Sequence, residues 1–312
     1  MRGFIFPTLW SLFVCTVWVA EVHSEALNGF NIDDSLVPIN EIMQGGPPRD
    51  GIPSIDNPRF LSLDQADFLE DEDRILGINH AGIQRAYPIR ILNYHEIVND
   101  RFAGRSVIVS FCPLCGTGMA FSGEIDGQSV EFGVSGLLYN SDLLMYDRDT
   151  ESLWSQIEGR AVAGLLKGKE LESIPVLHTT WADWRSRYPD SKVLSMETGH
   201  RRNYDKTPYP DYQTSRYVYF PVSTMDRRYH PKEPVLGVEL NGVSKVYPFI
   251  ELRKGNASFT DTIGDEQIRI HYQDDHKTAQ VFDNEGKELA SVIAFWFAWM
   301  AFHPESEVYQ VK

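Results

Sequence analysis

An internal repeat constrains the fold of this chain more than any other feature of its sequence. Residues 75–78, Ile-Leu-Gly-Ile, recur as Val-Leu-Gly-Val at 235–238, and the Ala-Tyr-Pro of 86–88 recurs as Val-Tyr-Pro at 246–248. Gly82 and Gly242 lie between the paired segments, and all three matches share one offset of 160 residues (77 to 237, 82 to 242, 88 to 248). Each copy is predicted to form a β-hairpin with its central glycine in the turn.

The repeat extends further along the chain, but its polar residues differ between the copies. At the same offset, Cys112 is aligned with Tyr272, Cys115 with Asp275 and His95 with Gly255. We therefore expect the first copy to bear a functional site and the second to act as a scaffold.

These patterns predict an α+β, β-rich fold made of two related β units with an irregular insertion between them. Residues 25–60 are rich in Pro, Gly, Asn and Asp and are expected to form an irregular lead-in. The first unit, with the insertion, is predicted to span 61–225, and the second unit, with an aromatic tail, 226–312. Alternating apolar and polar residues after Phe132 suggest further strands.

The first 24 residues have the features of a secretory signal peptide. Arg2 is followed by an almost wholly apolar stretch over 4–20, and Val-His-Ser at 22–24 offers a small-residue cleavage pattern. The protein is thus expected in the periplasm or outside the cell, with no membrane span after cleavage. Cys15 would leave with this leader, so that Cys112 and Cys115 are the cysteines of the exported protein.

The overall charge argues against nucleic acid as a partner. The chain has 44 Asp and Glu against 29 Lys and Arg, a formal net charge of −15, whereas nucleic-acid binding calls for a basic face. No phosphate-binding loop, dinucleotide fingerprint or common hydrolase motif is present. A small molecule or a metal-delivery protein is the expected partner.

The two cysteines are the strongest chemical signal. They follow an apolar run at 107–109 and form a C-x-x-C motif, which is followed by Gly116. Thiolates select copper(I), zinc or iron–sulfur, and imidazole suits copper and zinc. With His95 as a third ligand and the Met119 thioether nearby, we expect a metal site of Cys112, Cys115, His95 and Met119, with copper ahead of zinc.

Two alternatives without metal stay open. A C-x-x-C motif can carry thiol–disulfide exchange, although Gly116 and Gly118 oppose the helix that follows this motif in thioredoxin-like proteins. The pair can also form a structural disulfide in a non-catalytic scaffold. The leading hypothesis is an exported metal-binding protein in metal handling or in copper-dependent redox chemistry, which would make it a metal-dependent oxidoreductase.

Several of these motifs together resemble a known family. The segment 93–100, the Cys-Pro-Leu-Cys-Gly of 112–116, Phe-Gly-Val-Ser-Gly at 132–136 and the tail at 295–304 are similar to exported prokaryotic proteins catalogued as domain-of-unknown-function family 3179. The resemblance implies that His95, Glu96, Asp100 and the cysteine pair belong to one signature.

Acid–base roles follow for the polar members of that signature. His95 and Glu96 are candidates for a general base pair, and Glu96 or Asp100 for a carboxylate that orients His95. Asp142 and Asp147 are expected to bond the turn backbone and Arg148, respectively.

Overall fold

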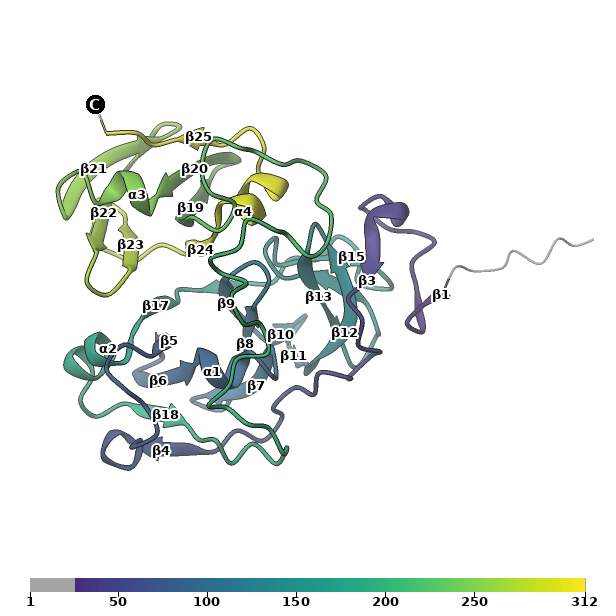
Figure 1. Cartoon of the computed structure of the whole chain (residues 1–312). Coiled ribbons are helices and arrows are strands. Elements are labelled where there is room, and N and C mark those ends of the chain that lie inside the picture. The colour runs from purple at the N-terminus through teal and green to yellow at the C-terminus, as the bar shows by residue number, and fades with distance from the viewer. Residues whose placement is uncertain (1–25, 312) are drawn as a thin grey trace, which may run out of the picture.

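The protein is built almost entirely from β-sheets. The computed structural model describes residues 26–311 (Figure 1). Strands make up 41% of the structure and helices 10%, and five sheets of three to five strands are arranged as in a five-bladed β-propeller. The predicted α+β fold of two units with an irregular insertion is therefore wrong. The α-helices of the described residues have only four to seven residues, too few to form a layer of their own.

The repeat corresponds to two sheets with the same strand order. The first sheet has the order β17-β5-β6-β18-β4 and the second β24-β19-β20-β25. The strands of the first are β4 (Phe60–Ser62), β5 (Arg74–His80), β6 (Ile83–Pro88), β17 (Leu177–Thr180) and β18 (Lys192–Leu194). Those of the second are β19 (Pro234–Leu240), β20 (Val243–Pro248), β24 (Val292–Phe295) and β25 (Glu307–Val308).

Short helices complete each copy in matching positions. They are α1 (Ile89–Leu92) and α2 (Trp181–Arg187) in the first copy, and α3 (Phe249–Leu252) and α4 (Trp296–Phe302) in the second. Trp184 of α2 lies against Gly77, where an added Cβ would come within 2.2 Å of its ring. Trp299 of α4 packs on Gly237 in the same way, at 2.1 Å. The repeated glycine is thus needed because an indole ring occupies the space of a side chain.

A three-stranded meander follows the hairpin in both copies. The first contains β7 (Ile97–Phe102), β8 (Arg105–Cys112) and β9 (Thr117–Ser122), extended by β16 (Ser173–Ile174). The second contains β21 (Ser258–Ile263), β22 (Glu266–Gln273) and β23 (Thr278–Phe282). From β7 onward the offset is 161 residues (97 to 258, 112 to 273), so that Cys112 corresponds to Gln273 and not to Tyr272. One extra residue after α3 accounts for the shift.

The region between the copies forms the fifth sheet and edge strands of other sheets rather than an irregular insertion. The fifth sheet has the strand order β15-β14-β13-β12-β3. The strands that the sequence predicts after Phe132 are therefore present. The strands are β3 (Ile42–Gln44), β12 (Phe132–Tyr139), β13 (Asp142–Asp147), β14 (Leu153–Ser155) and β15 (Arg160–Ala163). Because β3 comes from the lead-in, residues 25–60 contribute an edge strand to this sheet.

Smaller elements complete the structure. Two two-stranded ribbons pair β1 (Ala26–Leu27) with β2 (Phe30–Asn31) and β10 (Glu124–Ile125) with β11 (Gln128–Ser129). The 3₁₀ turns are η1 (Ile39–Glu41) and η2 (Leu63–Gln65). The predicted signal peptide lies outside the described residues. Within 26–311, none of the helices has the length and apolar character of a membrane span.

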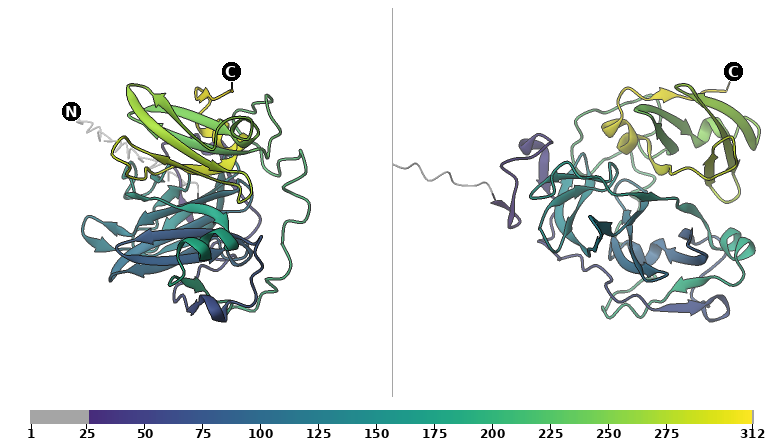
Figure 2. Two further views of the ribbon diagram at one scale, coloured as in Figure 1. Left: turned by 90° about the vertical axis from the view of Figure 1, so that its left-hand side faces the viewer. Right: turned by 180° about the vertical axis from the view of Figure 1, so that it is seen from behind.

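One long connection between β18 and β19 has neither helix nor strand. It covers residues 195–233, and Figure 2 shows it as the green trace along one side of the molecule, linking the two repeats. We call it the 195–233 segment. Despite its irregular backbone, it buries Tyr204 and Tyr212 against the sheets.

Candidate metal centre

The two cysteines lie at the turn that joins β8 to β9. Cys112 ends β8 opposite Thr117, and the Gly116 N–H donates to the Cys112 carbonyl at 2.9 Å. Gly116 has φ +65°, and the Phe295 ring lies 3.0 Å from where a Cβ would be, so that only glycine fits this turn. Both cysteines are buried free thiols.

Asp142 brings a carboxylate to the same point from the fifth sheet. It begins β13 after a turn in which Asn140 and Ser141 both have positive φ, +51° and +66°, as in a type I′ hairpin turn. The Ser141 carbonyl oxygen lies 3.3 Å from the Cys115 sulfur, which donates to it. The ligand atoms of Cys112, Cys115 and Asp142 all lie within 4.8 Å of one another, and all three residues are buried. We call this set the Cys–Cys–Asp group.

A buried polar network fixes the orientation of the carboxylate. One Asp142 oxygen accepts the Ile157 N–H at 3.1 Å, and the other accepts the Thr117 hydroxyl at 3.4 Å. Thr117 is also 2.6 Å from the Gln156 side-chain oxygen, and the Gln156 amide donates to Ser110 at 3.0 Å. Because these partners come from two strands, β8 and β9, and from the loop after β14, the position of Asp142 is set by the packing of two sheets.

The electrostatics of the group are those of buried acids. Burial raises the pKa of Asp142 from 3.8 to about 7 and raises the pKa of both thiols. Glu96 is also buried, and burial together with the charge of Asp142 raises its pKa from 4.5 to about 8. Among residues 26–311, neither carboxyl group takes part in an ion pair with a basic side chain. Four acids thus lie in or near one dry site, where a bound cation would stabilise their ionised forms.

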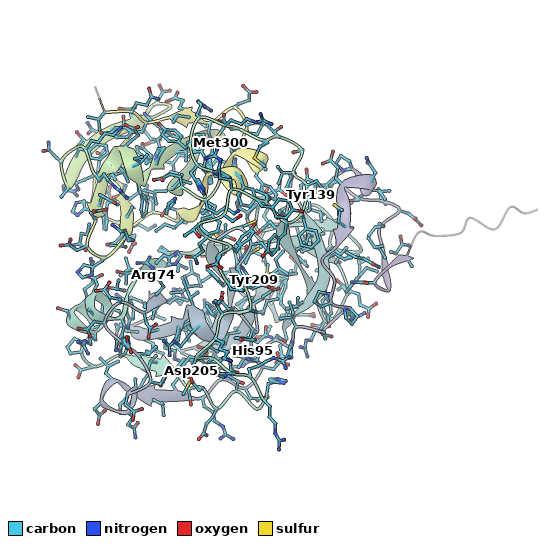
Figure 3. The ribbon with its side chains drawn as sticks, in the orientation of Figure 1. Arg74, His95, Tyr139, Asp205, Tyr209 and Met300 are labelled. Carbon is cyan, nitrogen blue, oxygen red and sulfur yellow. The ribbon has the colours of Figure 1, made fainter. Side chains whose placement is uncertain are left out.

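The structure does not bring His95 to the cysteines. Its Nδ1 lies 2.7 Å from the Pro53 carbonyl oxygen and its Nε2 lies 2.6 Å from the Tyr204 hydroxyl. Figure 3 shows His95 near Asp205. Asp205 follows Tyr204, the hydrogen-bond partner of His95, in the 195–233 segment. The next residue, Glu96, has φ +57° in the tight turn after α1, and its carboxyl is affected by the charge of Asp142, whereas the His95 ring is not part of that group. Burial lowers the pKa of His95 to about 4.

Asp100 and Met119, two further predicted site residues, have different surroundings. Asp100 accepts hydrogen bonds from the Arg85 guanidinium and the Tyr87 hydroxyl, which hold it in an ion pair between two sheets. Met119 lies on β9 in the same hydrophobic cluster as the cysteines and lines a cavity of about 460 Å³.

Asp142 was expected to bond turn backbone. It does accept a turn N–H, but from Ile157 in the turn after β14 and not from its own turn, and it also accepts the Thr117 hydroxyl. Asp147 does not pair with Arg148; it accepts from the Thr150 N–H and from the Trp154 indole N–H. The Asn-Ser-Asp order of residues 140–142 is typical of a hairpin turn and places a carboxylate beside it. This pattern does not predict which other part of the protein the turn contacts.

The sheets and this group define a β-propeller-like protein with a buried site of two thiols and a carboxylate. The chain matches the family described as "Protein of unknown function (DUF3179)" over residues 49–306 and belongs to it. The matched range contains the whole Cys–Cys–Asp group. No curated protein and no solved structure matches the chain.

Proposed function

We propose that the protein is an exported metal-binding protein that holds a divalent transition metal, zinc ahead of copper, in the Cys–Cys–Asp group. The observation that carries this proposal is the convergence of three ligand atoms from two sheets within 4.8 Å. Two thiolates and one carboxylate would carry three negative charges, which more than offset the two positive charges of the cation, and burial would exclude bulk water.

The donor set decides between the metals. Copper(I) prefers thiolate and thioether ligands, whereas zinc also accepts carboxylate oxygen. With Asp142 in the place expected for His95, the set favours zinc. Three protein ligands leave one tetrahedral position open, as in zinc sites that bind or activate a further ligand.

The raised pKa values of the two thiols are consistent with metal binding that releases protons. A metal binds thiolates, so the protons of Cys112 and Cys115 have to leave as the ion enters. The same values argue against thiol–disulfide exchange, because exchange is driven by thiols whose pKa is lowered. Dithiol chemistry stays the rival function, since the two sulfur atoms are close and not bonded.

Metal quantification tests the proposal. We expect about one zinc per chain in protein isolated without chelator, and loss of this zinc in Cys112→Ser. Asp142→Asn is expected to weaken zinc binding by at least about tenfold, because even partners outside the ligand set cost 10- to 100-fold.

Asp147→Asn is the matched control, since Asp147 is an equally buried aspartate on the same strand that bonds Thr150 and Trp154. Zinc affinity equal to that of the unmodified protein in Asp142→Asn would exclude Asp142 as a ligand. Protein that never carries metal but cycles between dithiol and disulfide would support the rival. Export is tested separately by the N-terminal residue of the protein recovered from cells.

A further inference from the structure

Two buried hydroxyl groups of residues beside the Cys–Cys–Asp group have no acceptor for their protons within the described part of the chain. They are Ser141 Oγ and Tyr212 Oη, and both side chains are almost completely buried, with about 1% of each residue exposed. Buried polar groups are nearly always paired in folded proteins, and an exception calls for a missing water, ion or ligand. Ser141 precedes Asp142 in the chain and Tyr212 packs in the cluster of the two cysteines, so one ligand bound at the group would explain both hydroxyls.

Tyr212 reaches the site from the 195–233 segment. It packs in the same hydrophobic cluster as Cys112 and Cys115, and the two thiols contribute to raising its pKa. The Lys232 ammonium lies 4.0 Å from the centre of its ring, and the Tyr219 ring lies 4.4 Å away. The backbone N–H of Tyr219 faces the hydroxyl oxygen, which leaves the hydroxyl proton without an acceptor.

Ser141 reaches the site from the hairpin turn. Its carbonyl oxygen accepts from the Cys115 thiol, and its neighbour Asp142 supplies the carboxylate. Serine at φ +66° is a strained conformation for a residue with a side chain. The turn therefore holds a serine, with a free hydroxyl, beside two of the three ligands.

We propose that these hydroxyls bind an exogenous oxygen or nitrogen ligand, either water or a small anion, at the open position of the metal. The inference rests on the proposed metal site. Three protein ligands leave a fourth tetrahedral position, and an anion or a water deprotonated to hydroxide there would accept hydrogen bonds from the two hydroxyls. Tyr212 thereby couples the metal to the 195–233 segment, which covers the site.

Azide binding to cobalt(II)-loaded protein tests this inference, because cobalt replaces zinc with similar geometry and its visible absorption reports a new ligand. We expect azide to bind the unmodified protein and its dissociation constant to rise about tenfold in Tyr212→Phe and in Ser141→Ala, the scale of one hydrogen bond to a charged group. Ser141→Gly tests the same hydroxyl without the strain of a side chain at positive φ.

Two variants serve as matched controls. Tyr217→Phe removes an exposed hydroxyl from the same segment, and Ser155→Ala removes a buried, unpartnered hydroxyl from β14. Both are expected to bind azide like the unmodified protein.

The outcomes separate this inference from the metal site itself. If the unmodified protein takes up no cobalt, the metal proposal fails and this inference with it. If cobalt binds but azide does not, or if Tyr212→Phe and both Ser141 variants bind azide as tightly as the controls, the metal site stands and the role of the hydroxyls is overturned.

Discussion

Glu96 gives the metal-free protein a stability that falls as the pH rises. Its carboxyl has a pKa of about 8 in the folded protein, against 4.5 as its ordinary value, because burial and the charge of Asp142 disfavour ionisation. Between these two values the folded protein binds more protons than the unfolded chain, so the free energy of unfolding decreases with increasing pH. The contribution is complete below about pH 4.5 and is lost as the pH rises to about 8.

Glu96→Gln isolates this effect, since glutamine resembles the protonated acid and does not titrate. From pH 5 to pH 8 the stability of the unmodified protein relative to Glu96→Gln is expected to fall by ~3.5 kcal/mol, at 1.36 kcal/mol per pKa unit. The comparison with the variant cancels the opposite trend from buried histidines such as His95, whose lowered pKa makes stability rise between about pH 4 and 6.5.

Urea unfolding followed by tryptophan fluorescence, with chelator present, measures the difference at both pH values. Glu285→Gln, at an exposed position, is the control and is expected to show no change with pH relative to the unmodified protein. If Glu96→Gln also keeps a constant difference from pH 5 to pH 8, Glu96 ionises like an exposed carboxylate and the dry site described here is refuted.

Three further outcomes are expected. Gly77→Ala and Gly237→Ala should each destabilise the protein by about 1–3 kcal/mol or more in urea unfolding, because a new Cβ meets a buried indole ring; a neutral result would contradict this packing. Lys232→Met removes the ammonium that donates to the Ser215 and Tyr217 carbonyls, so limited proteolysis should cut the 195–233 segment faster while the urea midpoint changes little. Zinc affinity, measured by chelator competition, should rise from pH 6 to pH 8 because binding has to displace the protons of the two thiols; a flat profile would argue against thiolate ligands.

The repeat could be recognised from the sequence because both hairpins need glycine and proline at the same positions. Gly77 and Gly237 have to leave room for an indole ring, and Pro88 and Pro248 each end a strand at the same place, so the pattern survives in the residues. The fifth sheet was harder to see. Strands were expected after Phe132, but not the sheet that they form, because β12 pairs with β3, an edge strand from the distant lead-in that no local pattern marks.

Two of the three members of the Cys–Cys–Asp group could be predicted from the sequence, and the third could not, for a physical reason. Cys112 and Cys115 are close in sequence, and a C-x-x-C turn brings them together locally. Asp142 joins them only because the β12–β13 turn packs against the β8–β9 turn, a contact that no local pattern encodes. His95 was expected nearby for its chemistry, but both of its ring nitrogens bond other partners, Pro53 and Tyr204.

The scaffold copy of the repeat also closes the site of the other copy. The Phe295 N–H donates to the Cys115 carbonyl at 2.8 Å, and its ring rests on Gly116. Duplication has therefore not produced two independent modules, because the copy without cysteines supplies a wall of the cysteine loop. A protein cut after residue 225 would lose that wall. A substitution of Phe295 in the second copy would change the surroundings of the cysteines in the first copy.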